Sequence, residues 1–330
     1  MKTMFRITNM GLSQFFQLSF NVRLTRSMPF AVLRCYLFLI GFFYFIMKHA
    51  DMKKIAVCLR YVLHLNQTTP QTYIDIINTY KGIIEHYYEK LIMAHRPLTE
   101  MFEFLSLRLH VANSSRLDRI AKSGKGAILV TGHFGAVEFL PLAMSIKGYK
   151  IAMICRFKTA KLREELIRKA RKFDVMLIDA DKPKVTFRAL KAIKEGRILI
   201  TECDEFSEWR PHRKQQIHLF GHRIPRDRTL DFFYRRAGVP AFMGLMKREK
   251  GRFVLTIDDL ADGSSETSLA ARAWKKLESY IFQYPQQWYQ WKEAAVQLHE
   301  PIALAFARDN RQRVLRPTSA ESPALATKTA

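Results

Sequence analysis

Cysteine is scarce in this chain, and its few cysteines lack the paired spacing of a metal site. The 330 residues contain four, at the scattered positions Cys35, Cys58, Cys155 and Cys203. Isolated thiols favour a reduced, cytoplasmic setting over a disulfide-bonded secreted scaffold. We therefore expect no disulfide framework and no bound metal ion.

Other familiar signals are also missing. The segment 123–126 (SGKG) is not a phosphate-binding P-loop, because the Gly-x4-Gly-Lys-Ser/Thr spacing is absent and the segment precedes a strand. The first long apolar run is not expected to be a secretory signal peptide, since it lacks a small-residue cleavage site and continues into basic sequence. No internal repeat is visible, which excludes a repeat architecture.

Acidic residues are few relative to basic ones. Thirty Asp and Glu stand against 54 Lys and Arg, for a formal net charge of +24. This charge indicates an acidic partner, which by composition alone is a nucleic acid, an anionic lipid or an acidic protein. Hydrophobic residues make up 48% of the chain, enough for one large α/β domain with an appendage or for two domains.

One apolar run stands out near the amino end, at residues 29–47, where Arg34 is the single charged residue. Its nineteen residues would rise about 28 Å as a helix, which is close to the thickness of a hydrocarbon core. We predict a transmembrane helix whose Arg34 reaches the headgroups, with a buried or half-inserted helix as the alternative. Basic residues flank both ends, so the positive-inside rule gives no orientation.

The rest of the chain divides by texture. Residues 1–28 form a basic leader, 48–122 a helical region, 123–293 an α/β domain, and 294–330 an extension that is disordered after about 316. Within the α/β domain, apolar runs of strand length alternate with helical patterns, which predicts a mostly parallel central sheet flanked by helices. The expected strands are 127–131, 150–155, 174–178, 197–202, 239–246 and 252–258. The expected helices are 137–147, 160–172, 184–195, 229–237 and 267–283.

His133 and Glu138 directly follow the buried strand 127–131. Open α/β sheets place their chemistry at the carboxyl ends of strands. Residues five apart are about 140° out of phase on a helix, so His133 belongs to the loop and Glu138 to the first helical turns. We predict that His133 is a general base oriented by Glu138, against the plainer alternative of a structural histidine and a carboxylate at a helix start.

Two more strand ends carry charged residues. Arg156 follows strand 150–155 and suits an anionic group or a developing oxyanion. Asp204 follows strand 197–202, where it would orient an arginine or hold the acceptor; structural pairing is the alternative. Arg171 shares a helix face with Arg168 and is a further candidate for substrate binding, although most charges there belong to a solvated surface.

The loop expected at 209–228 is densely basic. Its candidates for a phosphate or headgroup patch are Arg210, Arg213, Lys214 and Arg223. Arginine forks suit the phosphates of a lipid, and a nucleic-acid footprint would look similar by charge.

Taken in order, these blocks resemble the late lipid A acyltransferases, the lauroyl and myristoyl transferases within the His-x4-Asp/Glu acyltransferases. The resemblance covers about residues 29–293. It is carried by four blocks: Gly132-His133-Phe134 with Glu138, the strand end at Arg156, Asp204 ahead of a basic segment ending in Phe220-Gly221, and 284–292 (YPQQWYQWK). The chain departs from the family at Asp204-Glu205, where Asp-Gln is usual, at Arg156-Phe157, where Arg-Pro is usual, and in its reduced basic ending after Trp291.

The resemblance implies a glycerolipid-acyltransferase-like fold and an O-acyltransferase without a cofactor. His133 would deprotonate a hydroxyl of a lipid A precursor for attack on the thioester of acyl carrier protein or coenzyme A. Arg156, or backbone amides near Gly135, would stabilise the oxyanion. The setting would be the bacterial inner membrane, with the catalytic domain on the cytoplasmic face and no nucleic acid bound. Two alternatives stay open: an acyltransferase for a lysophospholipid, glycolipid or other amphiphile, and a non-enzymatic basic protein that binds membrane or nucleic acid.

Overall fold

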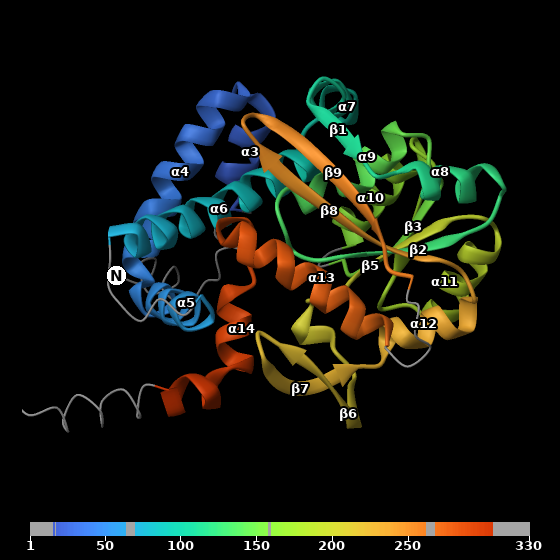
Figure 1. Cartoon of the computed structure of the whole chain (residues 1–330). Helices are drawn as coiled ribbons and strands as arrows, with labels where there is room; N and C mark the ends of the chain where they lie inside the picture. Colours follow the sequence, from blue (N-terminus) through green and yellow to red (C-terminus); the bar gives the residue numbers. More distant parts are fainter. Residues whose placement is uncertain (1–15, 17, 64–69, 158–159, 262–267, 306–330) are drawn as a thin grey trace, which may run out of the picture.

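The centre of the protein is a seven-stranded sheet with helices on both faces (Figure 1). A computed structural model describes residues 16, 18–63, 70–157, 160–261 and 268–305. The strand order is β1-β9-β8-β2-β5-β3-β4, and only the β8–β9 pair is antiparallel among the described strands of this sheet. The strands are β1 (Leu109–Ala112), β2 (Ala127–Thr131), β3 (Ile151–Cys155), β4 (Val175–Asp179), β5 (Ile198–Glu202), β8 (Ala241–Glu249) and β9 (Arg252–Asp259). The predicted α/β class with a mostly parallel sheet is confirmed.

The helices of the α/β part begin with α8 (Ser115–Lys122), which lies in the region 48–122 that was expected to be helical. The next five lie within a few residues of their predicted positions: α9 (Leu140–Ile146) after the 3-10 turn η1 (Val137–Phe139), α10 (Ala160–Arg171), α11 (Val185–Lys194), α12 (Thr229–Ala237) and α13 (Leu269–Gln283). The 3-10 turns η2 (Phe206–Glu208) and η3 (Pro285–Gln287) and helix α14 (Trp291–Gln297) complete this part. The amino-terminal helices are α3 (Ser19–Ser27), α4 (Phe30–Met47), α5 (His49–Val62), α6 (Pro70–His95) and α7 (Leu98–Ser106).

Strand β2 shows why this sequence forms a central strand. All five of its residues are buried. Ala127 and Leu129 belong to the core shared with α7, α8 and α9, whereas Ile128 and Val130 face the core shared with α11, α12 and α13. A strand covered on both faces reads as a continuous apolar run, which is why the sequence identified it.

Two elements differ from expectation. Residues 109–112, within the region expected to be helical, form the short edge strand β1, which pairs with β9 some 140 residues later. The expected loop 209–228 contains the hairpin of β6 (Pro211–Leu219) and β7 (His222–Asp227). Its turn is Phe220-Gly221, with φ of +48° and +81°, and two-residue hairpins favour such positive φ values. Basic side chains hid the strand pattern because only Ile217, Leu219 and Ile224 face the core.

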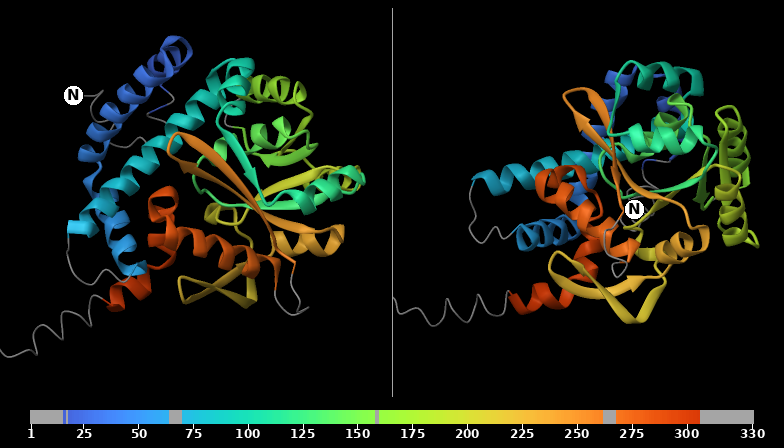
Figure 2. Two further views of the ribbon diagram at one scale, coloured as in Figure 1. Left: turned by 45° about the horizontal axis from the view of Figure 1, so that its top comes forward. Right: turned by 45° about the vertical axis from the view of Figure 1, so that its right-hand side comes forward.

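Helix α4 lies at the edge of the molecule and packs along α6 (Figures 1 and 2). It is the described helix that is long and apolar enough to cross a membrane by length and composition. Arg34, expected to reach lipid headgroups, donates a hydrogen bond to Glu85 of α6 over 2.6 Å. Most of the basic leader and the tail predicted to be disordered after 316 lie outside the described residues.

Candidate functional site

The strand order brings His133 and Asp204 together. Strands β2 and β5 are parallel neighbours, and their last residues, Thr131 and Glu202, are in register. His133 and Asp204 each follow two residues later, so both lie at the same sheet edge. Asp204 Oδ1 is 2.8 Å from His133 Nδ1, and the backbone N–H of His133 donates to Asp204 Oδ2 over 2.8 Å. The histidine is therefore held through its ring and its backbone by one carboxylate.

Asp204 is fully buried and receives a further hydrogen bond from the carboxyl-terminal part of the chain. Trp288 Nε1 donates to Asp204 Oδ2 over 2.7 Å, and the amide of Gln290 lies 3.1 Å from His133 Nδ1. Trp288 also forms an antiparallel bridge with Phe134. A buried carboxylate with several donors stays well solvated by the protein, which fixes its geometry.

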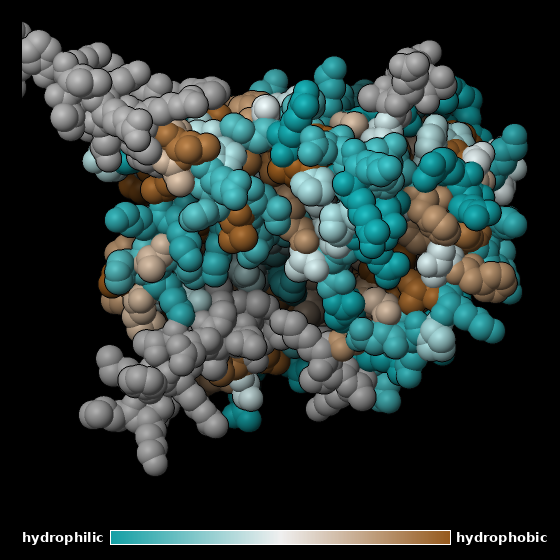
Figure 3. Space-filling model, turned by 90° about the horizontal axis from the view of Figure 1, so that it is seen from below, coloured by the Kyte–Doolittle hydropathy of each residue, from teal (hydrophilic) through white to brown (hydrophobic). Residues whose placement is uncertain are grey.

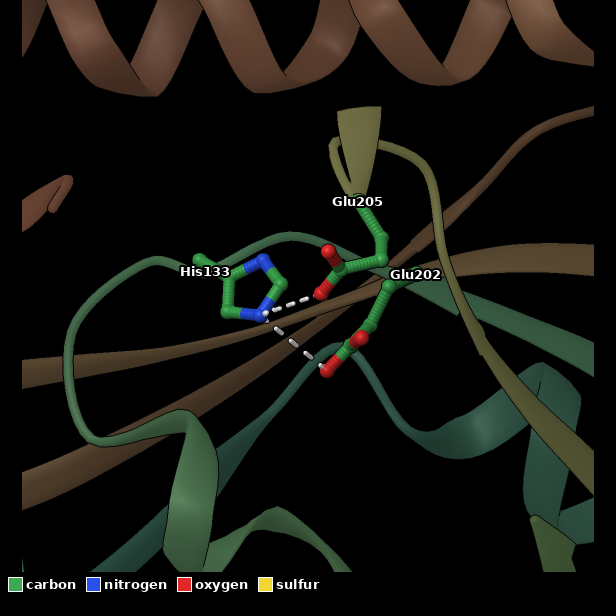
Figure 4. A group of neighbouring side chains, drawn as sticks. All are labelled: His133, Glu202 and Glu205. Carbon is green, nitrogen blue, oxygen red and sulfur yellow. Dashed lines mark ion pairs between the residues drawn. The ribbon is translucent and has the colours of Figure 1, made fainter. Parts of the chain in front are cut away.

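The other ring nitrogen, Nε2, faces two glutamates (Figure 4). It lies 3.6 Å from Glu202 Oε1 and 3.5 Å from Glu205 Oε2, and each glutamate side chain is 36% exposed. Burial alone would lower the pKa of His133, but Glu202, Asp204 and Glu205 together raise that pKa to about 10. The resting ring is therefore an imidazolium at neutral pH, in an acidic pocket of an otherwise basic protein.

His133, Glu202 and Glu205 form a candidate cation site. One ligand atom from each of His133, Glu202 and Glu205 lies within 4.8 Å of the others. An imidazole and two carboxylates are suitable donors for a divalent metal ion. A metal ion bound at Nε2 would replace the proton that the ring otherwise carries at neutral pH.

Glu138 does not hold the ring of His133 as predicted. Its Oε1 lies 3.3 Å from Lys90 Nζ and 3.6 Å from His86 Nε2, both on α6. The predicted placement in the first turn is correct, since Glu138 lies in η1, but that turn directs the carboxylate toward α6. Glu138 raises the pKa of Lys90, whereas burial and then Lys90 lower the pKa of His86 well below its usual value. The second half of the His-x4-Glu block thus anchors a lysine.

Tyr289 joins these two clusters. Its ring stacks on His86 at 3.6 Å between centroids and meets the edge of His133 at 4.8 Å. Glu202 also contributes to the raised pKa of Lys90, so the lysine and the histidine share one electrostatic environment. The site is a continuous group of titratable side chains that runs from Asp204 through His133 and Tyr289 to Lys90.

Gly135 does not provide the free backbone amide expected of an oxyanion donor. Its N–H donates to the Gln287 carbonyl and that of Ala136 to the Met246 carbonyl, each over 2.7 Å. The carbonyl of Gly135 accepts from Arg248 Nη2 over 2.7 Å. With φ at +59°, and with an added Cβ only 1.9 Å from the Met246 oxygen, this position requires glycine for the path of the loop.

Within the described part of the chain, the predicted arginines do not pair with His133 or with its neighbouring carboxylates. Arg156 is half-exposed and pairs with Asp181 and Glu208, so its charge is already matched by carboxylates. Arg171 is exposed at the end of α10. Lys90 pairs with Glu138, and Glu202 beside the histidine also contributes to the raised pKa of Lys90.

The basic patch candidates are all exposed on or beside the hairpin. The four side chains are Arg210, Arg213, Lys214 and Arg223. Seen from below, the molecule presents a mainly hydrophilic face with separate apolar patches (Figure 3). The basic patch is therefore open to solvent. At the tip of the hairpin, Phe220 packs on Trp288 and so connects the hairpin to the site.

Two cavities, of about 490 and 580 Å³, lie at the opposite edge of the sheet. Both are lined by Arg116 and by 238–240, which precede β8. Beside the buried ring of His133, Glu202 and Glu205 are the partly exposed side chains.

Sequence reasoning missed Lys90, His86, Tyr289 and Gln290 as parts of the site. Lys90 and His86 lie in a long helix with no local motif, and their signal is the tertiary packing of α6 beside η1. Tyr289 and Gln290 do lie in the segment 284–292, which the sequence analysis singled out without assigning these two residues a role.

A comparison with models of known protein families found no match, and a search of curated proteins found none.

Proposed function

We propose that this protein is a membrane-associated O-acyltransferase that moves a fatty acyl chain from a thioester to a hydroxyl of a lipid acceptor. The single observation that supports this most is the 2.8 Å contact between His133 Nδ1 and the buried Asp204. It fixes the ring so that Nε2 faces the exposed side of the site. An imidazole held in this way is a general base, with its carboxylate stabilising the imidazolium that forms.

The reaction needs no covalent enzyme intermediate. Neutral His133 takes the hydroxyl proton at Nε2 as the acceptor oxygen attacks the thioester carbonyl. The tetrahedral intermediate then expels the thiolate, which takes this proton from the imidazolium to give the free thiol. The C–O bond forms, the C–S bond breaks, and the histidine returns to the neutral form that began the step.

Lys90 is our candidate for the group that stabilises the oxyanion. We give it the role first assigned to Arg156 and to the amide of Gly135, because Lys90 shares the electrostatic environment of Glu202 beside the ring, whereas the Gly135 amide already donates to a backbone carbonyl. Glu138 holds the ammonium at 3.3 Å from its own oxygen. Positioned cations lower the energy of a developing oxyanion, and removing one such donor costs about 10²- to 10³-fold in rate.

The donor and the setting follow from charge and surface. The +24 charge suits an acyl carrier protein or coenzyme A as donor and an anionic acceptor such as a lipid A precursor. The hairpin arginines suit phosphate groups on that acceptor. Helix α4 suits attachment to a bacterial inner membrane with the site on the cytoplasmic face, where acyl thioesters are found.

The test incubates the purified protein with acyl carrier protein thioesters of several lengths and a panel of acceptors: a lipid A precursor, lysophospholipids and glycolipids. Mass spectrometry identifies the acylated product and so separates the acceptor classes. His133→Ala is expected to abolish transfer while its circular dichroism spectrum remains that of the folded protein. Full turnover in that variant, or no product from any pair, would defeat the proposal.

A metal-dependent hydrolase is the second candidate, favoured by the arrangement of His133, Glu202 and Glu205. These residues would hold a divalent ion that activates water for attack on an ester or amide. Elemental analysis distinguishes the two proposals. Stoichiometric metal that is lost in Glu202→Gln favours the hydrolase, whereas transfer that survives a chelator favours the acyltransferase.

A further inference from the structure

Helix α4 has two different faces. Its buried residues are Leu33, Leu37, Gly41, Tyr44 and Phe45. The opposite face carries large apolar side chains that are about half-exposed: Val32, Leu39, Phe42, Phe43 and Ile46. A contiguous apolar stripe of this size on a protein surface marks an interaction site.

The buried face lies along α6 over most of its length, with the two helices antiparallel. From one end to the other, the rings of Phe45 and Tyr80 are in tilted contact, Gly41 meets Ile84, and Tyr88 donates to the Phe30 carbonyl over 3.4 Å. At Gly41 an added Cβ would lie 3.0 Å from Ile84, so the two helices approach closely. Helix α4 is therefore a packed part of the fold.

Helix α6 is too polar to follow α4 across a bilayer. It carries Lys81, Glu85, Glu89 and Lys90 along the stretch that α4 covers, and it contributes to the candidate active site. Glu89 forms a buried ion pair with Arg248 of β8, which ties α6 to the sheet. A spanning α4 would either detach from α6 or draw these charges into hydrocarbon, and both are costly.

We infer that α4 lies in the plane of the membrane, with its exposed stripe embedded in one leaflet of an anionic bilayer. This inference rests on the membrane association proposed above. Both ends of α4 are flanked by exposed basic residues, Arg23 and Arg26 before it and Lys53 and Lys54 after it. A spanning helix would place one pair on each side of the membrane, whereas an in-plane helix places all four against the same anionic headgroups.

A second copy of the chain is the less favoured occupant. The basic residues at both ends of the stripe would face those of the other copy, whereas anionic lipid complements them. An apolar stripe with cationic residues at both ends thus indicates a lipid surface.

The first experiment measures topology with the full chain bound to sealed vesicles of phosphatidylglycerol and phosphatidylethanolamine. In a background with the accessible Cys35 and Cys155 replaced by serine, Arg26→Cys and Lys53→Cys are labelled separately with a membrane-impermeant maleimide. An in-plane helix leaves both sites reactive from the outside. Protection of either site until detergent is added would show a spanning helix and overturn the inference.

The second experiment measures vesicle flotation of Leu39→Glu/Phe42→Glu. We expect at least tenfold weaker binding than for Phe187→Glu, a matched control on α11 whose side chain is 65% exposed. Equal binding of both proteins, or cross-linking of Leu39→Cys between copies on the vesicles, would overturn the inference. Neither experiment depends on acyl transfer. If only the proposed chemistry is wrong, both experiments still give the expected results, and they do so with His133→Ala as well.

Discussion

The two sides of the His133 ring are built differently. On the Nδ1 side, the fully buried Asp204 accepts from the ring, from the backbone of His133 and from Trp288. On the Nε2 side, Glu202 and Glu205 lie farther away, at 3.5–3.6 Å, and are partly exposed. The comparison indicates a division of roles, because the buried side fixes the orientation of the ring while the open side sets its charge.

Removing the charge on the buried side should have the largest effect. In Asp204→Asn an amide replaces the carboxylate that accepts hydrogen bonds from three donors. The ring of His133 is then no longer held in one tautomer, and its imidazolium loses the neighbouring negative charge. We expect the rate of acyl transfer to fall by about 10⁴-fold, as expected for an equivalent carboxylate in a catalytic triad. Steady-state kinetics measures this, with Asp181→Asn, whose carboxylate pairs with the exposed Arg156, as the control. A loss below tenfold would show that Asp204 does not orient a catalytic base.

Lys90 provides the next test, because Glu202 on the open side contributes to its raised pKa. Lys90→Ala should lower kcat by about 10²- to 10³-fold with little change in KM, and Lys90→Arg should restore part of the rate. Lys191→Ala is the matched control, since Lys191 also pairs with a glutamate, at 3.7 Å, but on α11. A change confined to KM would assign Lys90 to ground-state binding of the substrate.

The loop that carries the ring can be broken at a single glycine. Gly135→Ala adds a methyl group that overlaps the Met246 carbonyl and places alanine at a positive φ. We expect about 100-fold lower activity. The free energy of unfolding should fall by more than the roughly 1–3 kcal/mol that a strained backbone conformation costs by itself. Gly148→Ala is the control, because its φ is +80° but no atom lies within 4 Å of the added Cβ. Chemical denaturation compares the two; equal losses would mean that φ alone matters.

The open side should be visible in the pH profile. The pKa of His133 is about 10, so kcat/KM should rise with pH toward that value as the neutral base forms. Glu202→Gln and Glu205→Gln each remove a negative charge, which lowers the pKa and moves the rise to lower pH. Glu208→Gln, whose carboxylate pairs with Arg156, should leave the profile in place. If kcat/KM rises at the same pH in all three variants, Glu202 and Glu205 do not set the pKa of His133.

The same raised pKa has a consequence for stability. An unfolded histidine has a pKa of about 6.5, below that of folded His133. The protonated folded form therefore contributes stability that is full below pH 6.5 and is lost as the pH approaches 10.

Local patterns predicted the strands and the position of His133 well, because buried strands and their carboxyl ends are encoded in short apolar runs. The pairing of His133 was not predicted, because it depends on β2 lying beside β5, which follows from packing between distant segments. The order of the strands along the chain would have placed β3 next to β2. The same limitation concealed β1, whose four residues are stabilised by β9.

The site joins segments that are made at different times. The histidine loop is synthesised well before Trp288 and Gln290, which brace it. A nascent chain that has reached only β9 already contains His133, Asp204 and Lys90 but lacks this brace. The ring can therefore be braced only after residue 290 has been made, when α4 is already available to reach the bilayer.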